Sequence, residues 1–150
     1  MIPALYVAKT GLSAQDTQLT TLSNNLANVS TTGFKRDRAE FQDLLYQIKR
    51  QPGAKSTQDS ELPSGLQLGT GVHIVGTQKN FSAGSLQTTG QPLDLAVNGF
   101  GTALQRTLET SNVSTVEERV NMITTQRAYE MNSKVISTAN QMLGALTQKL

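Results

Sequence analysis

Apolar residues recur every three or four positions near the start of the chain. They fall at Leu5, Ala8, Leu12, Leu19, Leu22, Leu26 and Val29, with Gln15 in the one missing slot. This seven-residue repeat predicts an amphipathic helix over residues 3–28. Pro3 suits its first turn, and Thr31-Thr32-Gly33 is expected to end it. The remaining positions carry Thr, Gln, Ser and Asn rather than Glu and Lys, which favours a stripe packed among several helices over a charge-selected zipper.

A second helical pattern covers residues 113–149. Ser114 and Glu117 have the spacing of a capping box at its start. The apolar positions downstream are Ala128, Met131, Val135, Ala139, Met142, Leu146 and Leu150. Their spacing is an eleven-residue repeat, unlike the seven-residue repeat near the N-terminus. The two stripes are therefore expected to pack together over a few turns and then diverge to meet other subunits.

The middle of the chain lacks a helical repeat of this length. Residues 34–50 are basic and mixed, and we expect a short helix around Phe41, Leu44, Leu45 and Ile48. Residues 51–65 have loop chemistry, and short strands are expected within residues 66–98. The predicted fold is α+β: long N- and C-terminal helices form a coiled-coil-like pair, with an extended segment and a small β-rich region between them.

The composition changes how these stripes are interpreted. Charged residues make up 16% of the chain, against about 25% in a typical globular protein. Apolar residues make up 37%, and Ser, Thr, Asn and Gln supply more than a third. Either part of the chain folds poorly alone, or neighbouring subunits complete its apolar faces. The net charge of +2 is too small to indicate nucleic-acid binding.

Few residues suggest catalysis or metal binding. The chain has no cysteine and one histidine, His73, which excludes disulfides, thiol chemistry and a histidine-rich metal site. Asp37, Glu40 and Asp43 have no nucleophile beside them and are expected to form salt bridges. A basic group is expected to be a solvated face rather than a nucleic-acid patch; it comprises Lys35, Arg36, Arg38, Lys49 and Arg50. We predict no enzyme, cofactor, metal site, transmembrane helix or cleaved signal peptide.

Two signatures carry a family resemblance. Residues 22–35 read LSNNLANVSTTGFK, which closely resembles the signature of bacterial flagellar rod and hook proteins. The C-terminal part resembles the same family: residues 109–113 read ETSNV, followed by Glu117-Glu118, Val120, Met122-Ile123, residues 126–130, Asn132 and Lys134. Residues 46–63 and 66–72 resemble the corresponding segments of the distal-rod (FlgG) branch of the family. Hook proteins commonly lack the first of these segments.

The resemblance implies a structural subunit of the flagellar distal rod. Such subunits assemble through their terminal helices into a straight, rigid tube that transmits torque from the basal body to the hook. The implied partners are copies of the chain, other rod and hook proteins, the basal-body rings and the flagellar type III export apparatus. The implied location is the basal body, spanning the periplasm toward the outer membrane. Compared with the family, a large outer β region is missing after residues 95–99.

The resemblance also divides the chain and its surfaces. We expect an N-terminal axial helix in residues 1–33, an extended linker in 34–65 containing the distal-rod segment 46–63, a β-rich stub in 66–108, and a C-terminal axial helix in 109–150. The expected inter-subunit or helix-pair interface comprises Leu5, Leu12, Leu19, Leu22, Asn24, Asn25, Leu26, Asn28, Val120, Ile123, Ala128, Met131, Val135, Met142 and Leu146. The distal-rod segment contributes Tyr46, Arg50, Pro52, Gly53, Leu62 and Pro63.

Several alternatives remain open from the residues alone. The N-terminal stripe can be an intramolecular core instead of an inter-subunit seam. Asn24, Asn25 and Asn28 can be helix-end residues or can hydrogen-bond across an interface. Within the family, the alternative is a hook or proximal-rod subunit. From another class, it is a soluble helical adaptor that binds one partner helix.

Overall fold

The computed structural model describes residues 3–53, 55–57, 60–61, 64–97 and 101–147. Two long helices, α1 (Pro3–Ala27) and α2 (Thr115–Thr147), flank ten strands. The strands are β1 (Asp37–Asp43), β2 (Tyr46–Arg50), β3 (Lys55–Thr57), β4 (Ser60–Glu61), β5 (Leu66–Gly69), β6 (Val72–Lys79), β7 (Leu86–Thr88), β8 (Leu95–Val97), β9 (Ala103–Gln105) and β10 (Thr107–Glu109). The predicted α+β class, with a helix at each end of the chain, is confirmed.

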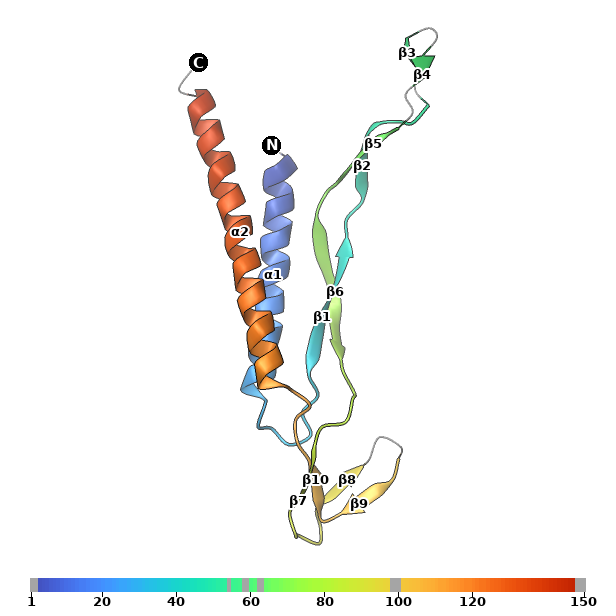
Figure 1. Ribbon diagram of the computed structural model, residues 1–150, viewed down its shortest axis with the longest axis vertical. Helices are drawn as coiled ribbons and strands as arrows, with labels where there is room; N and C mark the ends of the chain where they lie inside the picture. Colours follow the sequence, from blue (N-terminus) through green and yellow to red (C-terminus); the bar gives the residue numbers. More distant parts are fainter. Residues whose placement is uncertain (1–2, 54, 58–59, 62–63, 98–100, 148–150) are drawn as a thin grey trace.

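The helices lie side by side, and a long β ribbon runs along the far side of α1 (Figure 1). The helix pair and the ribbon both rise from the level where α1 ends and α2 begins. A small β stub, formed by β7 to β10, extends from the same level in the opposite direction (Figure 1). We call the meeting point of these three parts the junction; it comprises residues 25, 33–37, 80–85 and 109–118.

The ribbon is one antiparallel hairpin built from three consecutive strand pairs. β1 pairs with β6, β2 with β5, and β3 with β4. The short helix expected around Phe41, Leu44, Leu45 and Ile48 is therefore wrong, because this stretch forms β1 and β2. The expected boundary at residue 65 falls inside the hairpin, whose strands run from residue 37 to residue 79.

The helix pair packs through two matched seven-residue repeats. On α1, Ala8 and Leu22 are buried, and Leu5, Leu12, Leu19 and Leu26 are half-buried. On α2, Glu118, Thr125, Asn132 and Ala139 follow one another at intervals of seven; three are buried and Asn132 is half-buried. Of the eleven-residue stripe predicted on α2, Ala139 is buried on this face, whereas Met131, Val135 and Met142 are exposed beside it and line a pocket together with Ala4 of α1. The buried face escaped hydrophobicity analysis because three of its four members are polar.

The side of α1 that faces the ribbon is made of small residues. Ala14 and Thr21 are buried there. The hydroxyl groups of Thr10, Thr17 and Thr21 donate to helix carbonyls three or four residues earlier, at 2.8, 3.1 and 2.9 Å. Each hydroxyl is thus satisfied within the helix, so these threonines can pack like small apolar side chains. This polar side of α1 packs on the ribbon.

The helix ends differ slightly from expectation. α1 ends at Ala27, six residues before Gly33, and turns lead from its end to Gly33. At the start of α2, Ser114 Oγ accepts from Glu117 N at 3.5 Å, so Ser114 caps the helix. The Glu117 carboxylate instead pairs with Arg36 at 3.1 Å. Across the described residues, no helix is long and apolar enough to span a membrane, and no cluster of three metal-ligating side chains occurs.

Candidate functional site

Asn25 connects the last turn of α1 to the first residue of the ribbon. Its side chain is almost fully buried, with 1% exposure. Its Nδ2 donates to the Asp37 carbonyl at 2.8 Å, and its Oδ1 accepts from the Asp37 amide at 2.9 Å. The same Nδ2 lies 3.5 Å from Oε2 of Glu118 on α2. One amide therefore joins both helices and β1.

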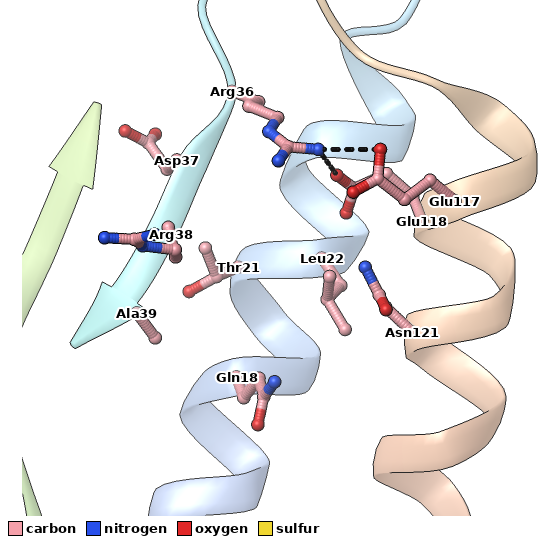
Figure 2. Close-up of a pocket in the computed structure, with 10 residues that line it drawn as sticks. All are labelled: Gln18, Thr21, Leu22, Arg36, Asp37, Arg38, Ala39, Glu117, Glu118 and Asn121. Carbon is pink, nitrogen blue, oxygen red and sulfur yellow. Dashed lines mark ion pairs between the residues drawn. The ribbon is translucent and has the colours of Figure 1, made fainter. Parts of the chain in front are cut away.

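Glu118 lies beside Asn25 and is itself buried, with 2% exposure. Figure 2 shows Arg36 reaching from the chain before β1 toward both acidic side chains at the start of α2. Its guanidinium lies 3.1 Å from Glu117 and 3.7 Å from Glu118. Burial raises the pKa of Glu118, while the hydrogen bond from Asn25 and the charge of Arg36 oppose that rise.

A second asparagine holds the other side of the junction. Asn112 Oδ1 accepts from the Arg36 amide at 2.8 Å. Its Nδ2 donates to the carbonyls of Asn80 and Ser82 at 2.8 and 3.0 Å. Asn112 therefore joins three chain segments: the entry to the ribbon, its exit, and the approach to α2.

A charged contact closes the junction toward the β stub. Glu109 Oε1 accepts from Lys35 Nζ and from the Gly84 amide, both at 2.6 Å. The hydrogen bond from Lys35 is the main reason that the pKa of Glu109 is lowered, and the Gly84 amide adds to it. Lys35 also donates to the Ser82 carbonyl at 2.9 Å. The junction is thus held by hydrogen bonds and ion pairs, with little apolar burial.

Away from the junction, α2 exposes a row of large apolar side chains. We call this row the outer stripe of α2; it comprises Val116, Val120, Ile123, Met131, Val135 and Met142, each 49–72% exposed. Val116, Val120 and Ile123 are three or four residues apart and share one side of the helix, opposite the face that packs on α1. Met131, Val135 and Met142 lie nearer to α1 and line a pocket together with Ala4.

The upper ribbon also carries apolar side chains, and it carries them on both faces. Tyr46 and Ile48 are two residues apart on β2 and share one face. Leu68 pairs with Gln47, and so lies with Leu66 on the other face. All four side chains are between 45% and 57% exposed. Neither face of this part of the ribbon is covered within the described chain.

The predicted site residues fall into three groups. The leucine stripe of α1 contributes to the intramolecular helix pair, and Ala128 is half-buried. Asn25 is in the junction, whereas Asn24 and Asn28 close the end of α1: Asn28 Nδ2 donates to the Asn24 carbonyl and Oδ1 at 2.9 and 3.1 Å. The exposed members are Val120, Ile123, Met131, Val135 and Met142 on α2, with Tyr46, Arg50, Pro52 and Gly53 on the ribbon. Leu62 and Pro63 lie outside the described residues, as does the side chain of Leu146.

Some of the acidic and basic residues considered from the sequence form surface salt bridges, and others belong to the junction. Asp37 pairs with Lys79 at 3.1 Å and Glu40 with Arg38 at 2.6 Å, as expected for salt bridges. Lys35 and Arg36 belong to the junction rather than to a solvated basic face. The roles of Glu109, Asn112 and Glu118 were not predicted from the sequence. All three belong to the C-terminal signature near the start of α2, and this is the feature of the sequence that could have identified them.

Comparison with known proteins gives two matches to family descriptions. Residues 5–35 match "Flagella basal body rod protein". Residues 104–149 match "Flagellar basal body rod FlgEFG protein C-terminal". These segments contain α2 and all but the first two residues of α1, and each supplies one half of the Asn25–Glu118 contact.

Relatives cover the rest of the chain. The flagellar basal-body rod protein FlgG of Buchnera aphidicola subsp. Schizaphis graminum is 34% identical over 259 aligned positions, covering 99% of this chain and 100% of the relative. The chain belongs to the family of flagellar basal-body rod proteins. It is a structural subunit of the flagellar rod, built as an α+β protein. Because the chain has 150 residues, that relative contains a long segment with no counterpart here.

Other relatives match over part of the chain. FlgG of Buchnera aphidicola subsp. Baizongia pistaciae is 52% identical over 101 residues, covering 67% of this chain and 39% of the relative. The flagellar hook protein FlgE of Helicobacter pylori is 39% identical over 101 residues, covering 67% of this chain and 14% of the relative. The rod is favoured over the hook because the FlgG segment is more similar to this chain than the FlgE segment, and because a FlgG relative matches over its full length.

Proposed function

We propose that the chain assembles through its terminal helices into a straight, rigid helical tube, the flagellar distal rod, which transmits torque from the basal body to the hook. The observation that carries this proposal is the outer stripe of α2. Exposed apolar patches of this kind usually mark association surfaces. Since Val116, Val120 and Ile123 lie on the side of α2 away from α1, this part of the outer stripe is free to meet another subunit.

An open helical assembly needs heterologous contacts, in which one face of a subunit meets a different face of the next. The chain offers such faces, because the outer stripe of α2 differs from the apolar faces of the ribbon around Tyr46, Ile48, Leu66 and Leu68, which are also exposed. The stripe is therefore suited to a head-to-tail neighbour rather than to a closed two-fold dimer.

The ribbon supports the assignment to the distal rod. A two-stranded ribbon with apolar side chains on both faces buries them only if something covers each face. In the proposed tube, the distal-rod segment from Tyr46 to Pro63 inserts between neighbouring subunits. Held on both faces, it resists sliding of one subunit past the next, which keeps the tube straight.

The division of labour follows from these surfaces. The axial layer is formed by residues 1–33 and 109–150. The wedge is formed by the segment 34–65 and its partner strands. The β stub within 66–108 lies where relatives carry a larger outer region. The partners are copies of the chain, other rod and hook proteins, the basal-body rings and the type III export apparatus. The place is the part of the basal body that spans the periplasm. The role is structural rather than enzymatic.

Substitution within the outer stripe tests the proposal. Val120→Ser and Ile123→Ser together remove exposed apolar area on the side of α2 away from α1, so the monomer should keep its helix content while tubes are lost. Gln126→Ser, on an exposed site outside the stripe, is the matched control and should assemble normally. Sedimentation velocity over a range of concentrations, with electron microscopy, gives the readout.

Each other result has a definite meaning. Tubes formed by the double variant would overturn the role of the outer stripe. A closed one-to-one complex of the parent chain with a helical partner would favour the adaptor. A supercoiled rather than straight tube would favour the hook.

A further inference from the structure

The contact between Asn25 and Asp37 has the form of a strand pairing made by a side chain. Two residues in a hydrogen-bonded antiparallel pair exchange both of their N–H···O bonds. Asn25 makes the same exchange with its carboxamide, through bonds of 2.8 and 2.9 Å to the two backbone groups of Asp37. The last turn of α1 thus presents one strand-like partner to the first residue of β1.

Few side chains can replace this amide. Its carbonyl takes the Asp37 N–H, one amide hydrogen goes to the Asp37 carbonyl, and the other points to Glu118. Aspartate has the shape but no donor, leucine has the size but no polar atoms, and glutamine places the amide one methylene further away. Because the site is almost fully buried, water cannot substitute for the missing bonds.

The contact between Asn25 and Asp37 lies at the start of the ribbon, where it affects the direction of the whole ribbon. Residues 28–36 alone connect α1 covalently to β1. The ribbon touches α1 again through Thr10, whose Oγ1 accepts from the Val72 amide at 3.4 Å. A Cβ on Gly71, where φ is +123°, would overlap that hydroxyl, so the backbone approaches very closely there. Thr10 and Asn25 are about 22 Å apart along the helix. Hydrogen bonds at both ends fix the direction of the ribbon along α1, whereas the packing of Ala14 and Thr21 between them is non-directional and allows the ribbon to change its angle.

The same contact couples the ribbon to α2. Arg36 precedes Asp37 and pairs with Glu117 and Glu118 at the first turns of α2. A change in the ribbon direction at Asp37 would therefore move Arg36 away from α2. The N-terminal signature supplies Asn25, Lys35 and its neighbours, and the C-terminal signature supplies Glu118, so neither half holds the ribbon alone.

We propose that Asn25 is a positioning residue that sets the angle between the helix pair and the ribbon, by acting as a one-residue strand partner for Asp37. The proposal concerns the geometry of the single chain and does not depend on tube assembly. It adds to the assembly proposal a reason why the ribbon of every subunit points in one direction.

Distances between two spin labels test it in the full-length chain. The chain has no cysteine, so Gln126→Cys on α2 and Thr77→Cys on β6, both at exposed positions, introduce the only two labelling sites. Pulsed electron–electron double resonance should give one narrow distribution of distances between the two labels in this double-cysteine chain. Asn25→Leu, which removes the bonds at Asp37, should raise the population at other distances roughly 5- to 30-fold. Asn24→Leu, one residue earlier and exposed, should leave the distribution narrow.

A second pair of variants approaches the contact from the ribbon side, in case Asn25→Leu unfolds the chain. Asp37→Pro removes the N–H that Asn25 accepts and leaves the helix sequences unchanged, so it should broaden the distribution. Asp37→Asn keeps both backbone bonds but loses the ion pair with Lys79, and should leave it narrow. Circular dichroism must show parental helix content in each variant compared.

Three results would overturn the proposal. The first is a narrow, parental distance distribution in a folded Asn25→Leu variant. The second is equal broadening in Asn24→Leu, which would indicate a general loss at the end of the helix. The third, which decides the matter if Asn25→Leu does not fold, is a narrow distribution in Asp37→Pro. Tube formation is not part of the readout, so failure of the assembly proposal would leave this test unaffected.

Discussion

Gly84 is the position in the junction where adding a single methyl group should be most damaging. A Cβ there would overlap the carbonyl oxygen of Thr110 and lie 3.1 Å from its carbonyl carbon. The obstacle is backbone rather than the end of a flexible side chain, so Gly84→Ala must push the two segments apart. Residues 80–85 and 109–112 would then separate at the point where they are held most closely.

The cost can be worked out from the bonds at this crossing. The Gly84 amide donates to the Glu109 carboxylate at 2.6 Å, and the Thr110 amide donates to the Ser85 carbonyl at 2.8 Å. A hydrogen bond to a charged group contributes about 1.5–3 kcal/mol and a neutral one about 0.5–1.5 kcal/mol. Losing both lowers the free energy of unfolding by about 2–4.5 kcal/mol, which corresponds to about 4–18 °C in Tm for a chain of this size.

Gly76→Ala is the matched control. Gly76 lies on β6, and a Cβ there would have no neighbour within 4 Å. Its Tm should stay near the parental value or rise slightly, because alanine restricts the unfolded chain. Thermal unfolding followed by far-UV circular dichroism gives Tm, and hydrogen exchange at the Gly84 and Thr110 amides shows where the structure opens. If Gly84→Ala and Gly76→Ala both have the Tm of the parent chain, the close approach of Gly84 to Thr110 does not hold the junction.

Three further predictions concern polar groups in the helix pair and the junction. Gln15 Oε1 is buried and accepts no hydrogen bond among the described residues, so Gln15→Leu should raise the free energy of unfolding in urea by about 1–3 kcal/mol; a decrease would mean that the amide is satisfied in solution. Glu118 has a raised pKa, so its contribution to stability is complete below the ordinary glutamate pKa of 4.5 and is lost as pH rises through the folded pKa. Glu118→Gln should therefore stabilise the chain at neutral pH and remove this loss from a pH series of melts, and an unchanged series would contradict the burial argument. Glu109 has a lowered pKa, so its contribution is present above 4.5 and is lost as pH falls through the folded pKa. Glu109→Gln should cost about 1–2 kcal/mol at neutral pH in the same melts and little in acid, and an equal cost at both pH values would refute the charged contact.

The terminal helices were predictable because their signal is local. The repeat of apolar residues gave α1 to within one residue at its C-terminal end and α2 to within two residues at each end. Capping by Ser114 was visible for the same reason, since a cap and its helix are adjacent in sequence. The inner face of α2 was not predictable, because Glu118, Thr125 and Asn132 are polar and a search for apolar spacing passes over them.

The ribbon was predicted only in part: short strands were expected within residues 66–98, where β5 and β6 lie, but not at β1 and β2. Alternation of apolar and polar residues identifies a strand only when one of its faces is buried. Here the apolar residues of β2 and β5 lie on opposite faces, and register shifts at Glu40/Phe41 and Ile48/Arg50 break the alternation further. The result resembles neither a regular strand nor a regular helix.

The junction could be predicted only in part. The asparagine-rich signature marked Asn25 as a candidate, but its partner is the backbone of a residue 12 positions away and a carboxylate 93 positions away. A backbone N–H or carbonyl leaves no trace in the sequence, because every residue but proline has both. The structure was needed to show that Asn25 and Asn112 bind backbone groups of segments distant in sequence.

These features together reverse the usual arrangement of a small globular protein. The buried apolar side chains among the described residues are few and mostly small: Ala8, Ala14, Leu22, Ala96, Val113 and Ala139. Large apolar side chains such as Leu45 and Leu93 are about nine-tenths exposed, at 89% and 90%. The single chain is shaped by hydrogen bonds at a polar junction, and its large apolar side chains are left exposed. In the proposed assembly these side chains would be buried against other subunits and would stabilise the folded state by mass action, while the junction would determine in advance the shape that is assembled.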